Sequence, residues 1–398
     1  MTVLTSSRRD ALAFGGATIF LASMGGMLRA ADPVGRPLPE ADAYAPWRLW
    51  NDPAIAGTPL ALVAAGVLAA NPHDTQPWLF GVSANAIEIF ADLSRNLGAM
   101  DAYVREMHLG LGCAIENMRL AAGPNGYAVE VEARPGSLTA LDEREAPVHA
   151  ATLRLTPRER TAPDSLYRAI PDRHTNRYAY DRDRALPEDW RRFASRAEAG
   201  DDVRVFLFED GEPRRLFDAA VVEATEAIIA DKTMIADSDR WFRNSSAQID
   251  AHRDGPTLEA AGLSSLTLLL ARLFPVSAET SHKAWLDQTR DVQLASAPVV
   301  GLIAVRDRYD RQSAIAAGRA WQRLHLGATA RGLAMQPLNQ PLEMIDREAE
   351  TGRGAAWAAR LARLTGPEWQ ATFAFRAGFA TRAAPPSPRR RLVDALAS

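Results

Sequence analysis

Two stretches in different halves of the chain carry the same pattern of small and apolar residues, and this repeat limits the possible folds more than any other feature. Residues 112–126 and 318–332 each have Gly, Ala, Leu, Ala and Gly at the same five spacings. Small residues along one stripe let a helix cross a neighbour closely, and a final Gly can end the helix in the left-handed conformation. The repeat predicts a duplicated unit, although two ordinary core helices with glycine caps would give the same pattern.

The segments around the repeat predict an α+β fold made of two fused half-domains, each a sheet packed with helices. In the first half we expect helices over 59–70 and 104–122, a hairpin over 78–82 and 86–90, and strands over 128–133 and 150–155. In the second half we expect strands over 204–208, 299–305 and 372–375 and helices over 210–230 and 312–331. These assignments rest on the two-residue period of strands and the helical spacing of apolar residues.

The expected domain boundaries divide the chain into a targeting segment over 1–31, a first half over 32–160 and a second half over 161–398. The second half contains a mostly helical insertion over 231–291. An insertion of this length is either a lid over a site or an extra packing layer.

The first residues have the anatomy of a twin-arginine export signal. The pair Arg8-Arg9 precedes an apolar, glycine-rich stretch over 11–28, and small residues follow at 30–31. We therefore expect the twin-arginine translocase to carry the chain to the periplasm or another extracytoplasmic location. The apolar stretch approaches the length of a short membrane span, so an uncleaved signal that anchors the chain is the alternative.

Composition argues against three other functional classes. The net charge of −3 and a single dense basic run, at 389–391, do not suit a nucleic-acid binder. One cysteine and seven histidines without metal-ligand spacing give no support to a zinc site. The chain also lacks the Gly-x-Ser-x-Gly elbow of a serine hydrolase.

Three segments carry residue types that bind an anion joined to a heteroaromatic ring. Arg173 and Arg177 flank Thr175, which should place two guanidinium groups and a hydroxyl within one helical turn. Guanidinium groups make bidentate, charge-assisted hydrogen bonds to phosphate. Arg389 and Arg390, held by flanking prolines, could close on the same anion, and the polar loop over 71–78 suits a ring edge. Taken singly, these segments are equally well a solvated helix start, a basic tail and a turn before a core tryptophan.

Together the segments resemble the nitroreductase family. Asn71-Pro72-His73-Asp74-Thr75-Gln76-Pro77-Trp78 resembles the family's loop that ends in Gln-Pro-Trp, and Arg173-x-Thr175-x-Arg177 resembles its Arg-x-Ser-x-Arg motif. The segment 332–339 looks like the turn that passes the flavin N5 edge, and Arg389-Arg390 looks like the closing phosphate ligands. Signal, length and motif order are most similar to the double-length Acg-like branch of the family.

The resemblance implies that the chain binds FMN without a side-chain nucleophile. Arg173, Thr175, Arg389 and Arg390 would be phosphate ligands, and Arg177 would lie near the N1/O2 edge of the flavin. The residues that would line the ring and its N5 edge are Asn71, Pro72, His73, Asp74, Gln76, Pro337, Leu338 and Asn339. Asp74 stands where the family usually has Asn, so an acceptor-only carboxylate replaces an amide. Thr175 for Ser is a mild change, and Pro72 replaces a small hydroxyl residue.

The distribution of these motifs predicts one composite site. Family members are typically homodimers with each flavin between two subunits, whereas here the loop occurs only in the first half and the arginine motif only in the second. One site should therefore survive, and its symmetry mate should be lost. The implied function is transfer of electrons to a nitroaromatic, quinone or similar planar acceptor, from NAD(P)H or from a membrane or periplasmic donor. The alternative is a protein that stores flavin without turnover.

Overall fold

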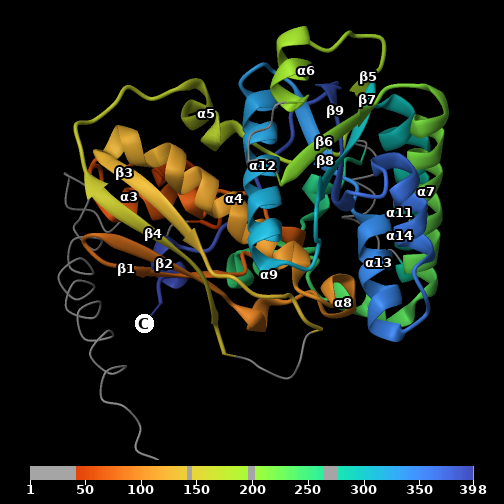
Figure 1. Cartoon of the computed structure of the whole chain (residues 1–398), viewed down its shortest axis with the longest axis horizontal. Helices are drawn as coiled ribbons and strands as arrows, with labels where there is room; N and C mark the ends of the chain where they lie inside the picture. Colours follow the sequence, from red (N-terminus) through yellow and green to blue (C-terminus); the bar gives the residue numbers. More distant parts are fainter. Residues whose placement is uncertain (1–41, 141–145, 196–201, 264–276, 398) are drawn as a thin grey trace, which may run out of the picture.

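The computed structural model describes residues 42–140, 146–195, 202–263 and 277–397. These residues form two antiparallel sheets with helices packed on them, so the α+β prediction is confirmed (Figure 1). The expected export signal over 1–31 lies outside the described residues. None of the helices within the described ranges combines the length and the apolar character needed to cross a bilayer.

The first sheet contains β1 (Trp78–Val82), β2 (Ala86–Ala91), β3 (Tyr127–Ala133) and β4 (Val148–Pro157) in the order β1-β2-β4-β3. The helices α3 (Pro59–Gly66) and α4 (Arg105–Ala122) contact this sheet. The predicted hairpin, both later strands and the long helix are confirmed. The first predicted helix ends at Gly66 rather than at residue 70, because the chain turns there toward the polar loop that precedes β1.

The second sheet contains β6 (Val203–Phe208), β7 (Val299–Val305), β8 (Ala334–Pro337) and β9 (Gln370–Ala380). A short strand, β5 (Tyr180–Asp181), pairs with the end of β9. The helix α12 (Arg311–Thr329) lies between the two sheets, and α7 (Gly211–Ala230), α13 (Gln340–Thr351) and α14 (Ala356–Thr365) lie on the other side of the second sheet (Figure 1). Helices on both faces explain why every residue of β7 is buried. Strand β8 and helices α13 and α14 were not predicted.

The two sheets share one topology. The strand order β1-β2-β4-β3 corresponds to β6-β7-β9-β8, and all of these pairs are antiparallel. In each unit a long helix, α4 or α12, joins the second strand to the third. The register of each central pair skips one residue at the same place, Ala150 in β4 and Thr372 in β9, each the third residue of its strand. This agreement is what a duplicated unit requires.

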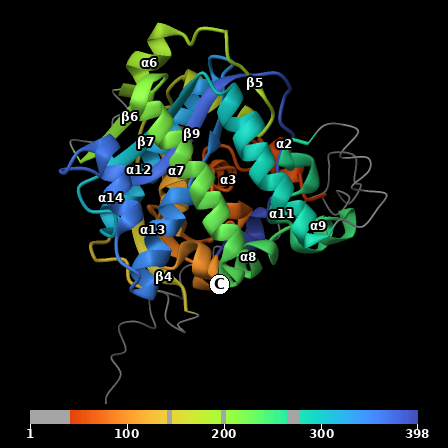
Figure 2. The ribbon, with the colours of Figure 1, turned by 90° about the vertical axis from the view of Figure 1, so that its right-hand side faces the viewer.

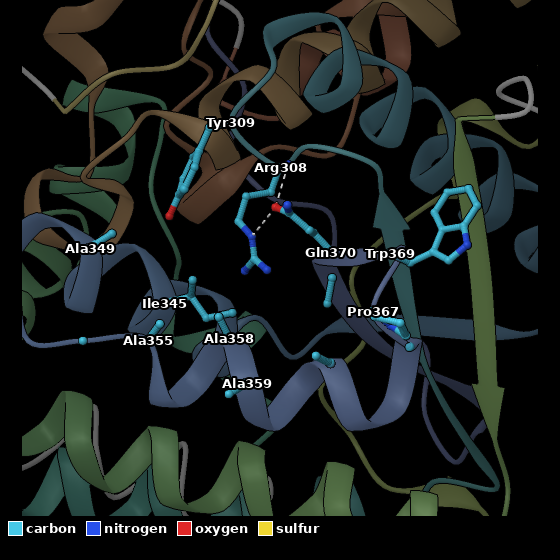
Figure 3. Close-up of a pocket in the computed structure, with 14 residues that line it drawn as sticks. Arg308, Tyr309, Ile345, Ala349, Ala355, Ala358, Ala359, Pro367, Trp369 and Gln370 are labelled. Carbon is cyan, nitrogen blue, oxygen red and sulfur yellow. Dashed lines mark hydrogen bonds between the residues drawn. The ribbon is translucent and has the colours of Figure 1, made fainter.

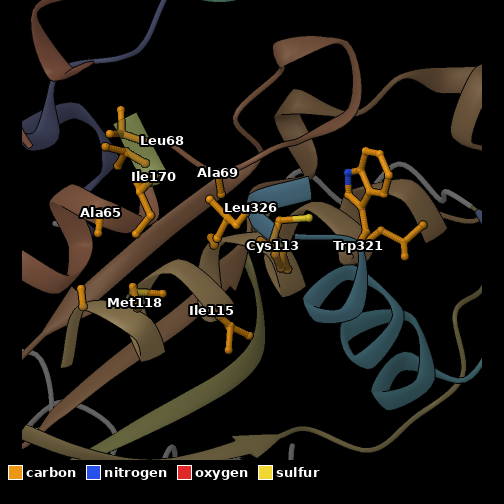
Figure 4. Packing of buried hydrophobic residues seen from close by; sticks show 14 of the residues in the cluster. Ala65, Leu68, Ala69, Cys113, Ile115, Met118, Ile170, Trp321 and Leu326 are labelled. Carbon is orange, nitrogen blue, oxygen red and sulfur yellow. The ribbon is translucent and has the colours of Figure 1, made fainter. Parts of the chain in front are cut away.

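The two repeated helices cross each other at their equivalent glycines. A Cβ atom on Gly318 would lie 2.0 Å from the carbonyl oxygen of Leu109, and one on Gly112 would lie 2.2 Å from that of Ile315. The predicted close crossing is therefore confirmed, and its partner is the other copy of the repeat. Around the crossing, Cys113, Trp321 and Leu326 belong to one continuous hydrophobic core that spans both units (Figure 4). The final glycines of the repeat adopt left-handed φ angles of 85° and 73°.

Next to the crossing, one buried carboxylate holds three arginines. Glu116 on α4 accepts hydrogen bonds from Arg119, at 2.7 Å, and from Arg319 and Arg323 of α12, at 3.2 and 2.8 Å. The Glu116 side chain is completely buried. The pKa of Glu116 is lowered, because its arginine partners outweigh the effect of burial. This ion cluster joins the two units by charge as well as by packing.

The remaining elements are short helices: α2 (Ala45–Leu49), α5 (Ser165–Arg168), α6 (Glu188–Ser195), α8 (Lys232–Asp239), α9 (Ser246–His252) and α11 (Ala278–Asp287). The helices α8, α9 and α11 belong to the predicted insertion, and α8 and α11 lie beside α7 (Figure 2). The C-terminal tail leaves the second sheet and reaches the first, where the backbone amide of Ala397 donates to the carbonyl of Phe80 on β1 at 2.9 Å. The second unit therefore supplies its tail to the first.

Candidate functional site

The loop before β1 folds around the side chain of Asn71. The Oδ1 atom of Asn71 accepts from the backbone amide of Gln76 at 2.7 Å, and its Nδ2 atom donates to Asp74 at 3.3 Å. The loop packs tightly on α4, because a Cβ atom on Gly110 would lie 3.1 Å from the ring of Pro72. Asn71 therefore holds the loop in shape rather than pointing freely into a site.

The same loop stores backbone strain. His73, Asp74 and Gln76 have φ angles of 44°, 51° and 50°, in the left-handed region that residues with a Cβ rarely adopt. Strained residues of this kind persist only where the surrounding structure holds them, and they gather at binding sites. In this conformation the Asp74 carboxylate accepts a hydrogen bond from Arg389 of the C-terminal tail.

The segment with Arg173, Thr175 and Arg177 is extended, so the prediction that these residues occupy one helical turn is wrong. A short helical turn ends at Asp172, and Arg173 already has an extended backbone with ψ at 102°. Thr175 forms a parallel bridge to Met335 of β8, and the amide of Asn176 donates to the Met335 carbonyl at 3.1 Å. Pairing with β8, an element that the sequence did not predict, overrides the helical tendency.

Arg173 is a buried cation without a carboxylate partner in the described chain. Its side chain donates to the carbonyl of Leu68 at 3.1 Å and lies 3.5 Å from His325 Nδ1 on α12, while its Nε atom has no partner. Burial first, and the nearby positive charge of Arg389 second, lower its pKa to about 9. A guanidinium in this position is stabilised by any anion that reaches it.

Arg389 comes from the C-terminal tail and meets Asp74 from the early loop. Its Nη1 atom donates to Asp74 Oδ1, and the Arg389 side chain is 2% exposed. It also donates to Ser387 and stacks over the Trp47 ring, with the guanidinium carbon 4.8 Å from the ring centroid. Burial raises the pKa of Asp74 to about 7, although Arg389 and the Asn71 amide both oppose this shift. One carboxylate thus faces two buried guanidinium groups, those of Arg173 and Arg389.

Arg177 lies in the same electrostatic environment. Its Nη1 atom donates to the carbonyl of Ala260 at 3.2 Å, and Asp74 is one of the charges that act on it. The pKa of His73 is lowered to about 4, by burial first and by Arg177 second. The imidazole of His73 is therefore neutral at pH 7, and its Nε2 atom lies 3.1 Å from the Ser238 hydroxyl.

Arg390 points away from this cluster. Its guanidinium donates to the carbonyls of Gln76 and Trp78 at 3.2 and 3.3 Å, and also to the carbonyl of Asp394. The Gln76 side chain is used in the same way, since its Oε1 accepts from the Arg390 amide at 2.7 Å and its Nε2 donates to the Arg253 carbonyl at 2.9 Å. Arg390 and Gln76 fasten the tail to the loop, so Arg389 is the tail residue that the structure brings to the charged cluster.

The turn after β8 lies in other surroundings. Leu338 is fully buried in the second hydrophobic core, and the Asn339 side chain accepts from the backbone amide of Ala374 at 2.9 Å. Pro337 pairs with Phe375 of β9. The structure therefore joins the early loop, the arginine segment and the tail. Pro337, Leu338 and Asn339 instead contact the second core and β9.

The cluster has the properties of an anion site. The carboxylate of Asp74 interacts with three arginines, Arg389 directly and Arg173 and Arg177 through their charges, so positive charge exceeds negative charge here. Buried polar atoms without a partner gather here: Asp74 Oδ2, Thr75 Oγ1, Arg173 Nε, His174 Nδ1, His325 Nε2 and Arg389 Nε. Buried polar atoms are normally hydrogen-bonded, and the unpartnered Nε donors of Arg173 and Arg389 beside excess positive charge fit a phosphate. The residues present therefore fit the phosphate end of a flavin mononucleotide.

The insertion packs against this cluster. The amide of Gly255 donates to the carbonyl of Asp74 at 3.1 Å, and a Cβ atom on Gly262 would lie 2.5 Å from the Arg177 carbonyl oxygen. Asp254 forms ion pairs with Arg95 of the first unit and with Arg243. These contacts place part of the insertion beside the cluster.

Two residues at the cluster escaped the sequence analysis. Trp47 on α2 lies against Arg389 and against His174, whose ring centroid is 4.6 Å from its own, and its Nε1 donates to the Ser387 carbonyl at 2.7 Å. His325 faces Arg173 from α12. The sequence offered two signals, the position of Trp47 directly after Pro46 and the position of His325 on the repeated helix. Neither signal shows which residues these side chains contact, because that depends on the fold.

No family model matches the chain, but two proteins of known sequence are similar to most of it. A Mycobacterium tuberculosis protein named "Putative NAD(P)H nitroreductase Rv3131" is 27% identical over 347 residues, which cover 86% of this chain and 91% of that protein. A second protein from the same organism, "Putative NAD(P)H nitroreductase acg", is 26% identical over 284 residues, covering 69% of this chain and 78% of that protein.

Solved structures of shorter chains also align with part of this one. The FMN-dependent nitroreductase NfnB from Mycobacterium smegmatis, solved with NADPH, has a TM-score of 0.35 and 17% identity, and the alignment covers 58% of this chain and 96% of that one. A nitroreductase with bound FMN from Desulfitobacterium hafniense has a TM-score of 0.34 and 13% identity, with coverage of 56% and 93%. These scores are low, and the relationship rests on the sequence relatives. This chain is similar to the two mycobacterial relatives along most of their length.

Proposed function

We propose that the protein is an FMN-dependent oxidoreductase of the nitroreductase type. The observation that carries this proposal is the meeting of Arg173 and Arg389 with a single carboxylate, Asp74, in a buried place where both guanidinium Nε atoms lack partners. The names of the two sequence relatives, and the FMN in the printed names of the aligned structures, supply the chemical class.

The residues of the cluster would hold the phosphate end of the cofactor. Arg173 and Arg389 offer charge-assisted donors, and the neutral His174 and His325 leave ring nitrogens for further hydrogen bonds. Arg177 adds positive charge beside them. FMN, when bound, supplies the transfer of hydride or electrons, while the protein orients it and excludes water. Nitroaromatics and quinones are the proposed acceptors, and NAD(P)H, named for the relatives, is the first donor to test.

The first experiment is to purify the full chain and measure its bound flavin. We expect FMN in a ratio of one per chain, reduction of the flavin by NADPH, and reoxidation by menadione. The Arg173→Ala variant should lose most of the flavin, whereas Arg168→Ala, an exposed arginine on α5 close by in sequence, should keep it. Folded Arg173→Ala protein with unchanged flavin content would show that Arg173 is not a phosphate ligand. Colourless protein that takes up no added FMN would refute the proposal as a whole.

Flavin storage is a second candidate function, and the contacts of the insertion favour it. The Gly255 amide donates to the Asp74 carbonyl, and the Ala260 carbonyl accepts from the Arg177 side chain. The insertion therefore lies directly against the cluster. A covered flavin would be retained but shielded from substrates. Protein that keeps its FMN through dialysis, yet reacts with neither NADPH nor menadione, would identify this function.

We also propose export by the twin-arginine route, which residues 8–31 support. NAD(P)H is scarce outside the cytoplasm, so an exported enzyme would take electrons from a membrane or periplasmic donor. Cell fractionation tests the route, since Arg8→Lys together with Arg9→Lys should retain the protein in the cytoplasm. Equal distribution of both proteins would refute it. An uncleaved signal would instead leave the chain in the membrane fraction.

A further inference from the structure

The second unit contains a pocket that shares no residue with the anion cluster. It has a volume of about 400 Å³ and lies between α13, α14 and the start of β9 (Figure 3). One wall consists of alanine side chains from α14, among them Ala358 and Ala359, and Ile345 of α13 lies beside them. Methyl groups in a row make this wall smooth and apolar.

A single cation, Arg308, projects into this pocket. Arg308 follows β7, and its Nε atom donates to Gln370 Oε1 at 3.2 Å, which turns the other edge of the guanidinium toward Ile345 and Ala358 (Figure 3). The residue is 6% exposed, and its Nη1 atom has no hydrogen-bond partner. Within the described ranges Arg308 forms no ion pair.

The carboxylate that acts most strongly on Arg308, that of Asp346, is already in use. Asp346 accepts from Arg105 Nε at 2.9 Å and from the hydroxyl of Tyr309 at 3.0 Å. Burial lowers the pKa of Arg308, and Asp346 offsets this only in part. A buried guanidinium without its own counter-ion is costly, so a site of this kind is completed by an anion from outside.

The residues before α14 complete the lining of the pocket. Gly354 and Ala355 both line it, and the helix begins directly after them. The amide of Trp357 in the first turn of α14 donates to Glu348 Oε2 at 3.0 Å, so this turn already has an anionic partner. Arg308 is therefore the feature of the pocket that suits negative charge.

We propose that this pocket binds a small apolar monocarboxylate, with the carboxylate on Arg308 and the apolar part along the alanine wall of α14. A carboxylate matches the free edge of one guanidinium, which can donate two parallel hydrogen bonds to it. A phosphate dianion fits less well, because a single buried guanidinium leaves its second charge unpaired in apolar surroundings. Neutral apolar molecules would leave Arg308 without an anion.

Calorimetric titration of the full chain with decanoate tests this proposal, with decanol as the neutral comparison. We expect decanoate to bind at least about tenfold more tightly than decanol, because hydrogen bonds to a charged group are the strong ones. Arg308→Gln should remove this preference. Arg306→Gln is the matched control: Arg306 is a neighbouring exposed arginine that pairs with Glu368 at 3.2 Å, and its loss should change nothing.

A second variant covers the case in which Arg308→Gln disturbs folding. Ala358→Phe fills the pocket while leaving the cation in place, and it should also abolish decanoate binding. Equal affinity for decanoate and decanol, or decanoate binding that survives Ala358→Phe, would overturn the proposal. The flavin absorbance of the same samples reports separately on the anion cluster, so failure at one site is not mistaken for failure at the other.

Discussion

Asp74 gives the sharpest test of how the anion cluster works. Its carboxylate is the one negative charge between Arg389 and Arg173, and burial raises its pKa to about 7. A phosphate that enters the cluster brings further negative charge, which raises the pKa of Asp74 again. Above pH 7 wild-type protein must therefore take up a proton, or move Asp74 aside, when FMN binds.

Asp74→Asn removes this cost and keeps the shape of the side chain. If Asp74 is neutral in the complex, its ionisation in the free protein weakens FMN binding by a factor of about 1 at pH 6, about 2 at pH 7 and about 10 at pH 8. The loss at pH 8 equals about 1.4 kcal/mol. We therefore expect the Asn variant to bind FMN about tenfold more tightly than wild type at pH 8 and equally well at pH 6. Titrating flavin-free protein with FMN and following flavin fluorescence measures both constants.

Stability of the flavin-free protein gives a second readout of the same residue. The folded pKa of Asp74 is raised above its unfolded value near 4, so its contribution to stability is lost as the pH rises from about 4 to 7. Asp74→Asn should therefore be the more stable protein at pH 8, by as much as about 4 kcal/mol, and should lose this advantage in acid. Asp172→Asn, an exposed aspartate beside Arg173, is the control. A ratio of FMN affinities that stays the same from pH 6 to pH 8 would refute the reasoning.

Two further predictions concern the junction of the two units. Gly318→Ala should lower the free energy of unfolding by at least about 3 kcal/mol in thermal or urea denaturation, because its Cβ meets the backbone of Leu109. Gly327→Ala on the same helix meets only the movable ring of Phe193 and should cost less; equal losses would contradict the close crossing. Glu116→Gln should destabilise the protein by about 3 kcal/mol at pH 7, because it leaves three arginines without their carboxylate. Since the pKa of Glu116 is lowered, this difference should shrink below about pH 4, and a difference independent of pH would contradict the ion cluster.

Much of the fold could be predicted from the sequence because its long elements have strong periods. The repeated helices, the β1–β2 hairpin and the apolar strand β7 follow from spacing alone. Strand β8 was missed because Ala334–Pro337 is short and contains glutamine and proline, so only its pairing with β9 makes it a strand. That missed strand also explains the wrong helical prediction for Arg173–Arg177, since it supplies the partner that keeps the segment extended.

The site was harder to predict than the fold. Adjacent arginines look alike in a sequence, yet Arg389 enters the charged cluster and Arg390 binds backbone carbonyls. Backbone direction alone separates their roles, and that direction depends on contacts with the early loop. The participation of Trp47 and His325 depends likewise on packing between segments far apart in the chain.

The pairing of Asp74 with Arg389 spans 315 positions of the sequence. A chain still under synthesis has its early loop in place long before the tail is made, so no partly made copy can assemble the cluster. Contacts of such long range also form late in folding, because much of the chain must be ordered before they can close. Occupancy of the cluster would therefore report that synthesis has passed Arg389, and a product truncated before Arg389 would be recognisable by its lack of ligand.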